Sequence, residues 1–231
     1  MPNLSFVIPA YNEEKRISKT LDNYTKFLNP YKDYEIIVVC NGCTDNTVSI
    51  VKSFSEKNKK IKLLEFREKI GKGGAVIEGL KVAKKDIIGF VDADDAFELN
   101  GLKNLIKEID SYDGAIASKW KGKKFSEVSE PFLRKLFSRG WNLLIRTLFG
   151  LKFKDTQSGA KFFKKKVISA IDKNFICNGF EFDVELLWKI KKKRFRIKEV
   201  YVPTKHTKYS TFSNKYIFIM FKNILKLRLY G

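Results

Sequence analysis

Two aspartates separated by a single residue are the clearest candidates for chemistry in this sequence. Asp92 and Asp94 follow the apolar, β-branched run 87–91, which is typical of a buried parallel strand. Residues two apart on an extended chain point to the same side, so both carboxylates could reach one ion. Hard oxygen ligands suit Mg²⁺ or Mn²⁺, which often bridge protein carboxylates to a ligand's phosphates. An aspartate-rich helix cap has the same composition, so the pair alone leaves both interpretations open.

Two more polar segments follow predicted strands. Asn41 ends the second strand beside Gly42, and its amide offers both a donor and an acceptor to a base edge. Residues 71–74, Gly-Lys-Gly-Gly, open a helix after the third strand, where bare N–H groups and a lysine favour an anion. Each segment alone is also explained as a simple turn. Because parallel strands end at one edge of a sheet, the three segments together fit a nucleoside diphosphate with a divalent ion.

The elements that would position these residues alternate along the first 110 residues. Apolar runs and helical periodicity predict strands and helices in turn: strands 4–9, 35–39, 61–66 and 87–91, and helices 13–28, 45–57, 73–83 and 99–109. Asn12 is the expected cap of the first helix. Short links between the elements indicate a parallel sheet covered on both faces.

The alternation breaks after residue 110. The later elements are predicted as strand 114–118, a basic helix at 132–149, a strand pair within 156–163, helix 183–193, strand 197–202 and a C-terminal apolar, basic segment at 216–229. The predicted fold class is therefore α/β: a Rossmann-like, mostly parallel sheet with helices on both faces. Residues 1–210 would form one domain, and 211–231 a C-terminal amphipathic appendage at a membrane interface.

Composition restricts the partners. Lysine and arginine number 46 against 26 acidic residues, and the net charge of +20 favours polyanions such as nucleic acid, anionic lipid or phosphorylated ligands. Segments 132–149 and 216–229 mix aromatic and basic residues, which is typical of helices in an anionic membrane interface. The alternative is that both segments pack on the protein core. No signal peptide and no spanning stretch is recognised, so we expect a soluble or peripheral protein.

The three cysteines include a C-x-x-C pair, Cys40 and Cys43. An odd count without a signal peptide indicates reduced, cytosolic thiols. A redox role or a zinc site is conceivable for the pair. Zinc would require two further ligands, and the only histidine is His206.

Several ordered motifs resemble the family 2 glycosyltransferases of GT-A fold. They are VIPAYNEE (7–14), EIIVVCNGCTDNT (35–47), GKGGAVIEGL (71–80) and VDADDA (91–96). DTQSGAKFF (155–163) and FEFDVELLWK (180–189) are most similar to dolichyl-phosphate glucosyltransferases, with dolichyl-phosphate mannose synthases next. The resemblance implies that residues 1–110 bind the nucleotide and 111–210 the acceptor.

The resemblance also implies an activity. A hexose, glucose first, would pass with inversion from a nucleotide sugar to a polyprenyl (dolichyl) phosphate, with Mg²⁺ or Mn²⁺ as cofactor. UDP-glucose would be the donor, and GDP-mannose with mannosyl transfer is the alternative. The enzyme would act on the cytoplasmic face of the membrane, bound peripherally to its anionic surface.

Site residues follow from the resemblance by position. The nucleotide would contact Pro9, Tyr11, Glu13, Asn41 and Lys72. Asp92 and Asp94 would hold the metal, with Asp94 as the direct ligand. The acceptor phosphate would contact Lys119, Arg134 and Ser138.

The chain departs from the family pattern at three places. Cys40-Asn41 stands where the family has Asp-Asp or Asp-Asn, and Asn41 could still accept from a uracil N3–H through its amide oxygen, without charge. Ala96 replaces the glutamine of many mannose synthases, as in the glucosyl type. The family's Gly-x-Ser-Lys segment is matched only loosely by residues 208–211.

Catalysis would need little help from a base, since a phosphate acceptor is already ionised near neutral pH. Positioning and metal stabilisation of the leaving diphosphate would then supply most of the rate. Glu181, Asp183 and Glu185 are the alternative bases, although Asp183 and Glu185 are also explained by capping or facing the helix they begin.

Three other functions compete with this hypothesis. A phosphatase or phosphotransferase with an aspartate nucleophile would need threonine or valine where Ala96 stands. A nucleic-acid binder would fit the charge, but no nucleic-acid motif is recognised, and we expect no such partner. A family 2 enzyme could instead glycosylate a polysaccharide or a protein.

Overall fold

The predicted alternation of strands and helices is present in the computed structural model, which describes residues 2–128, 132–205 and 215–231. The strands are β1 (Leu4–Ala10), β2 (Tyr34–Asn41), β3 (Ile61–Phe66), β4 (Ile87–Val91), β5 (Gly114–Ser118), β6 (Ala160–Lys164) and β7 (Ile197–Tyr201). The α-helices are α1 (Ile17–Leu28), α2 (Thr47–Lys57), α3 (Gly71–Val82), α4 (Leu99–Lys107), α5 (Phe132–Phe149), α6 (Lys165–Ala170), α7 (Phe182–Lys192) and α8 (Lys215–Tyr230).

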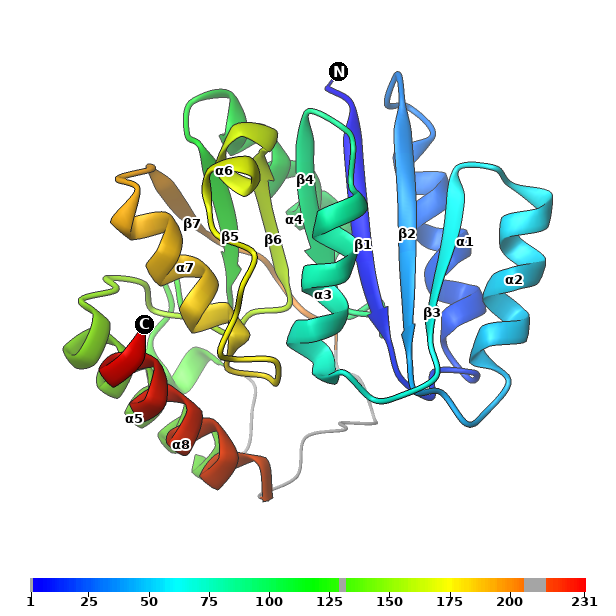
Figure 1. Cartoon of the computed structure of the whole chain (residues 1–231). Coiled ribbons are helices and arrows are strands. Elements are labelled where there is room, and N and C mark those ends of the chain that lie inside the picture. Colours follow the sequence, from blue (N-terminus) through cyan, green and yellow to red (C-terminus); the bar gives the residue numbers. More distant parts are fainter. Residues whose placement is uncertain (1, 129–131, 206–214) are drawn as a thin grey trace.

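The strands form one sheet in the order β3-β2-β1-β4-β6-β5-β7 (Figure 1). Strand β6 is antiparallel to both of its neighbours, and the other pairs are parallel. The mostly parallel α/β sheet expected from the sequence is thus confirmed. The expected strand pair within 156–163 is wrong: one strand, β6, pairs with β4 on one side and β5 on the other.

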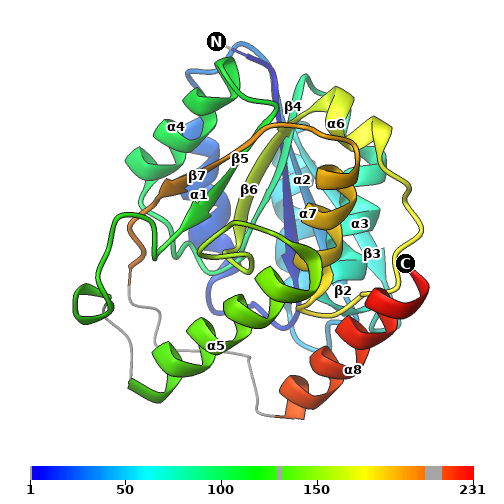
Figure 2. The same cartoon turned by 90° about the vertical axis from the view of Figure 1, so that its left-hand side faces the viewer.

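Helices cover both faces of the sheet because neighbouring strand residues point to opposite sides. In β1, Phe6 joins the core under α1, α2 and α4, and Val7 joins the core under α3, α6 and α7. Figures 1 and 2 show these two layers. The C-terminal helix α8 is anchored to the second layer, because Ile224 and Leu227 are fully buried in it.

The first helix starts later than its sequence periodicity indicates. Helix α1 begins at Ile17, so the predicted start at residue 13 is wrong. Asn12 does not cap it. Asn12 has φ of 54°, its Oδ1 accepts from the Thr44 N–H, and its Nδ2 donates to Thr44 Oγ1. The side chain therefore ties the β1 and β2 ends together instead of starting a helix.

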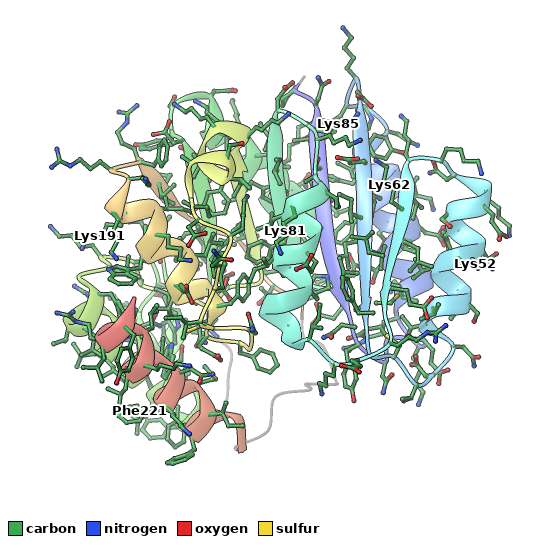
Figure 3. The ribbon with its side chains drawn as sticks, viewed as in Figure 1. Lys52, Lys62, Lys81, Lys85, Lys191 and Phe221 are labelled. Atoms are coloured by element: carbon green, nitrogen blue, oxygen red, sulfur yellow. The ribbon has the colours of Figure 1, made fainter. Side chains whose placement is uncertain are left out.

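Helices α5 and α8 lie at the end of the molecule where β1 and β2 finish (Figures 1 and 2). Both present large apolar side chains to solvent: Phe132, Leu136, Phe137 and Leu143 on α5, and Phe218, Ile219, Phe221, Leu225, Leu229 and Tyr230 on α8. Phe221 points outward from α8 (Figure 3). Within the described ranges, no helix is both long and apolar enough to cross a membrane.

Candidate active site

The carboxyl ends of β1, β2 and β4 open into a cleft of about 1990 Å³ that also reaches α5 and α8. Chain connections reverse direction between β1 and β4, and open α/β sheets bind ligands outside such a point. Nine of the residues predicted for the site line this cleft: Pro9, Tyr11, Glu13, Asn41, Lys72, Asp92, Asp94, Lys119 and Ser138. Arg134 lies on α5, and its side chain is outside the described part of the structure.

Asp92 and Asp94 create a concentration of negative charge in the cleft. Burial raises the pKa of Asp94, and the Asp92 carboxylate raises it further. Burial also raises the pKa of Glu13, in spite of the Arg16 guanidinium 2.6 Å from its Oε2, and both aspartates add to the rise. A cation between Asp92 and Asp94 would relieve this repulsion. The donor set therefore fits a divalent ion, whose remaining ligands would come from the substrate diphosphate and water.

The third aspartate of the motif has a different task. Asp95 has φ of 51°, and its Oδ2 accepts from Asn23 Nδ2 at 2.8 Å and from Lys205 Nζ at 3.1 Å. It therefore links α1 to the segment after β7. Among the described residues that line the cleft are Asp92 and Asp94 but not Asp95, so the motif contributes a pair of carboxylates to it.

Lys72 and Asp183 complete the charges on the cleft floor. Lys72 Nζ lies 2.6 Å from Asp92 Oδ1. Burial tends to lower the Lys72 pKa, but the Asp92 and Asp183 carboxylates outweigh it and raise the pKa, so the ammonium stays charged. Asp183 is itself paired with the fully buried Lys161 at 2.6 Å. Burial raises the Asp183 pKa, while Lys161 and Lys72 oppose that shift.

Two N–H groups of the glycine-rich segment, which the sequence predicted to be bare, have backbone partners. The Gly73 N–H donates to the Gly179 carbonyl and the Gly74 N–H to the Asn178 carbonyl, each at 3.1 Å. A Cβ on Gly71 would lie only 2.2 Å from the Asn178 oxygen. These glycines therefore let a distant loop pack on α3, and the Gly73 and Gly74 N–H groups do not face an anion. Lys72 remains as the cationic group of this segment in the cleft.

Gly159 is a site residue that the sequence analysis missed. A Cβ on this glycine would lie 1.8 Å from Asp92 Oδ2, so the backbone here touches the Asp92 carboxylate. Lys161, two residues later, was also missed. Its signal was a lysine inside the apolar strand 160–163, where a charge needs a buried partner.

All three alternative bases have structural partners, and that of Asp183 is the buried Lys161. Glu185 Oε2 accepts from the N–H groups of Ile176 and Cys177, and its Oε1 lies 3.0 Å from Lys189 Nζ. Glu181 Oε1 accepts from Asn223 Nδ2 on α8 at 2.7 Å. These bonds give both glutamates a role in holding loops and α8. Asp183 is paired with Lys161 and, through its charge, also raises the pKa of Lys72.

Polar groups at the far side of the cleft lie near α5. Ser138 Oγ accepts from Trp120 Nε1 at 3.1 Å, which fixes the hydroxyl relative to the segment after β5. The Lys119 N–H donates to Asp155 Oδ2 at 3.2 Å. Lys119 and Ser138 thus lie on two segments that are held by these hydrogen bonds, and both residues line the same cleft.

The C-x-x-C pair consists of free thiols. A hydrogen bond from Cys40 lowers the pKa of Cys43 to about 6, although burial opposes the shift, and the pKa of Cys40 is raised. In the part of the chain that the structure describes, no group of three or more His, Cys, Asp or Glu side chains could hold a metal. A zinc site built on this pair within that part is therefore excluded.

We expect Cys43 to react with iodoacetamide at near-neutral pH with a midpoint of about 6. Cys40→Ser replaces the thiol donor, and Cys40→Ala removes it, so the Cys43 midpoint should rise most in Cys40→Ala. The midpoint is measured by mass spectrometry of the Cys43 peptide after timed alkylation from pH 5 to 9. An unchanged midpoint in Cys40→Ala would contradict the assigned cause.

The fold and the cleft define an α/β protein with a ligand-sized cleft at the carboxyl ends of its parallel strands, and the comparisons identify its family. Residues 5–172 match the family described as Glycosyl transferase family 2, and the chain belongs to this family. The dolichyl-phosphate beta-glucosyltransferase of Dictyostelium discoideum is 34% identical over 213 residues, which are 86% of this chain and 65% of that protein. The chain therefore spans just under two thirds of the length of this relative.

A second relative is similar over nearly its entire length. The UDP-N-acetylglucosamine–dolichyl-phosphate N-acetylglucosaminyltransferase of Methanococcus voltae is 30% identical over 96% of this chain and 93% of its own. Two solved structures share the fold. Glucosyl-3-phosphoglycerate synthase from Mycobacterium tuberculosis with Mn²⁺ and UDP-glucose has a TM-score of 0.68 at 18% identity, over 97% of this chain and 77% of its own.

The other solved structure is a mannosyltransferase from Pyrobaculum calidifontis in complex with GDP-mannose and Mn²⁺. Its TM-score is 0.67 at 19% identity, and the match covers 100% of this chain and 65% of that one. Both likenesses establish the GT-A type of fold predicted from the sequence motifs.

Proposed function

We propose that this protein transfers glucose from a nucleotide sugar to dolichyl phosphate at a membrane surface, with inversion and with Mg²⁺ or Mn²⁺. The observation that carries the proposal is the Asp92–Asp94 pair, which faces a cleft whose other end opens between the apolar surfaces of α5 and α8. The names of the dolichyl-phosphate glucosyltransferases at 32–34% identity support the sugar and the acceptor.

The donor would lie across the ends of β2, β1 and β4. Asn41 would contact the base, Pro9, Tyr11 and Glu13 the nucleoside, and Lys72 the diphosphate. Asp92 and Asp94 would hold the divalent ion, which stabilises charge on the leaving diphosphate. Lys72 adds a second positive charge on the same side, and its raised pKa keeps it protonated.

The acceptor would enter from α5 and α8. Residues 111–210 supply Lys119, Ser138 and Arg134 for its phosphate, and residues 211–231 belong to the membrane-facing segment. Both helices contribute apolar side chains to the cleft lining, beside the basic Arg139 and Arg146 of α5: Leu136, Phe137, Leu143, Leu144, Ile217 and Ile219. An isoprenoid chain fits that surface, and its ionised phosphate would leave the rate flat above about pH 7.

The test is an incubation of the protein with membrane lipid extract, Mn²⁺ and labelled UDP-glucose, UDP-N-acetylglucosamine or GDP-mannose in parallel. Transfer of glucose label into the organic phase is the expected result. N-acetylglucosamine is the second candidate, because the Methanococcus voltae relative matches over nearly its entire length. Mannosyl label would favour GDP-mannose as donor. Label that stays in water with all three sugars contradicts a lipid acceptor and would favour a polysaccharide or protein acceptor.

The proposed location is the cytoplasmic face of a membrane, where the protein would be bound peripherally through α5 and α8. Ile224, within the expected membrane-interfacial segment 216–229, is fully buried in the core and cannot insert into lipid. Phe218, Phe221 and Leu225 are 75%, 42% and 40% exposed, and these α8 side chains would insert into the lipid. Their helical spacing of three and four places them along one face of α8.

We expect strong binding to anionic vesicles, weak binding to neutral ones, and a loss at high salt, because each basic residue near the surface contributes about 1 kcal/mol. Changing Phe218 and Phe221 to Ser should weaken the part of the vesicle binding that persists at high salt, because apolar insertion supplies it. Co-sedimentation with vesicles measures both effects. Val82→Ser, at a residue 40% exposed on α3, is the matched control. Wild-type protein that stays in the supernatant at low salt would contradict the membrane proposal.

A further inference from the structure

We infer that the base subsite recognises acceptor atoms of the nucleobase and not its ring N–H, so that cytosine is accepted alongside uracil. The inference rests on the proposed function and concerns the part of the cleft at the ends of β1, β2 and β3. Three residues there carry the argument: Asn41, Lys69 and Tyr11, all of which line the cleft.

The orientation of the Asn41 amide is fixed by one hydrogen bond. Asn41 is 3% exposed, and its Oδ1 accepts from the Ile70 N–H at 2.7 Å. An N–H group cannot donate to an amide NH₂, so the oxygen must face Ile70 and Nδ2 must take the other position. No group of the described residues accepts from Nδ2. Nδ2 is thus available to a ligand in the cleft, and this donor is the group by which Asn41 differs from an aspartate.

An aspartate at this position would behave in the opposite way. One carboxylate oxygen would accept from Ile70, and the second would present an acceptor where the amide presents Nδ2. A carboxylate selects a ring N–H, which uracil has at N3. Cytosine has an acceptor at N3, and both pyrimidines have the O2 acceptor. Asn41 thus removes the group that would exclude cytosine.

The neighbouring side chain adds a second donor. Lys69 Nζ lies 3.8 Å from the centre of the Tyr11 ring, and an ammonium group can only donate. Its backbone is held close to the end of β2, because a Cβ on Gly42, at φ of +65°, would lie 3.0 Å from the Lys69 nitrogen.

Glu13, a carboxylate that lines the cleft, is engaged through one of its two oxygens. Glu13 Oε2 accepts from Arg16 Nε at 2.7 Å and lies 2.6 Å from another guanidinium nitrogen of the same residue. Donors therefore dominate the base subsite in the described part of the cleft. A base is favoured by the acceptors it presents, which uracil and cytosine share.

The experiment is calorimetric titration of the full chain with UDP, CDP and GDP in the presence of Mn²⁺. In the wild type we expect UDP and CDP to bind with dissociation constants within about threefold of each other. Asn41→Asp keeps the bond to Ile70 and should shift the ratio at least tenfold towards UDP, about 1.4 kcal/mol. Asn104→Asp makes the same change at an exposed position on α4 and should leave the ratio unchanged.

Wild-type protein that prefers UDP by more than tenfold, or an Asn41→Asp variant with the wild-type ratio, would overturn the inference. Binding of GDP to the exclusion of both pyrimidines would also overturn it. Failure of all three nucleotides to bind has a different meaning, because it contradicts the proposed nucleotide-sugar donor itself.

Discussion

Asp94→Asn is expected to reduce sugar transfer about 100-fold or more. A divalent ion at the site would lose a charged ligand, and the ion's stabilisation of the leaving diphosphate is worth several kcal/mol. The fold should survive the change. Burial and the Asp92 carboxylate raise the pKa of Asp94, so above that pKa its charge disfavours the native state. Removing the charge should therefore leave the unfolding temperature unchanged or higher at neutral pH.

The measurement is a transfer assay with saturating Mn²⁺, paired with thermal unfolding of the same preparations. Asp110→Asn, at an exposed position after α4, is the matched control and should retain full activity. Near wild-type transfer by Asp94→Asn would refute the assignment of Asp94 as a metal ligand. A large fall in unfolding temperature would refute the stability argument alone.

Gly159→Ala is expected to impair the site without unfolding the protein. The new methyl group would lie 1.8 Å from Asp92 Oδ2, which is impossible, so the carboxylate must rotate away. Only the end of a side chain has to move, and the fold should tolerate that. A displacement of about 1 Å in a catalytic group can cost about 100-fold in rate.

The readouts for Gly159→Ala are the transfer rate and the affinity for Mn²⁺ with UDP, and both should fall. Gly140→Ala is the control, because a Cβ on Gly140, in α5, meets nothing within 4 Å. If Gly159→Ala transfers sugar as fast as Gly140→Ala, the position of Asp92 does not matter to the reaction.

The sequence was sufficient for the parts of the structure that depend on local patterns. Strand–helix alternation follows from periodicity within single segments, and it correctly predicted the mostly parallel sheet and its two helical layers. The gathering of Asn41, Lys72 and Asp92 in one cleft followed from that topology.

Features that depend on distant segments were not predictable in this way. The glycines of α3 contact residues 178–179, about a hundred positions away, so the Gly73 and Gly74 N–H groups expected to face an anion bond to that loop. Lys161 and Asp183 come from β6 and α7 and pair only in the folded chain. The same limit applies to Asn12, whose partner Thr44 follows a different strand.

The place of β6 in the sheet has a consequence for how the chain acquires its structure. Strand β4 is complete at Val91, but one of its edges pairs with β6, which runs from Ala160 to Lys164. During synthesis on the ribosome, β1 to β4 can assemble while that edge, Ile87–Val91, stays unpaired until about seventy more residues have emerged. An unpaired apolar edge invites aggregation, and long-range pairing is slow. The nascent first half is therefore the stage at which this protein most needs protection by chaperones.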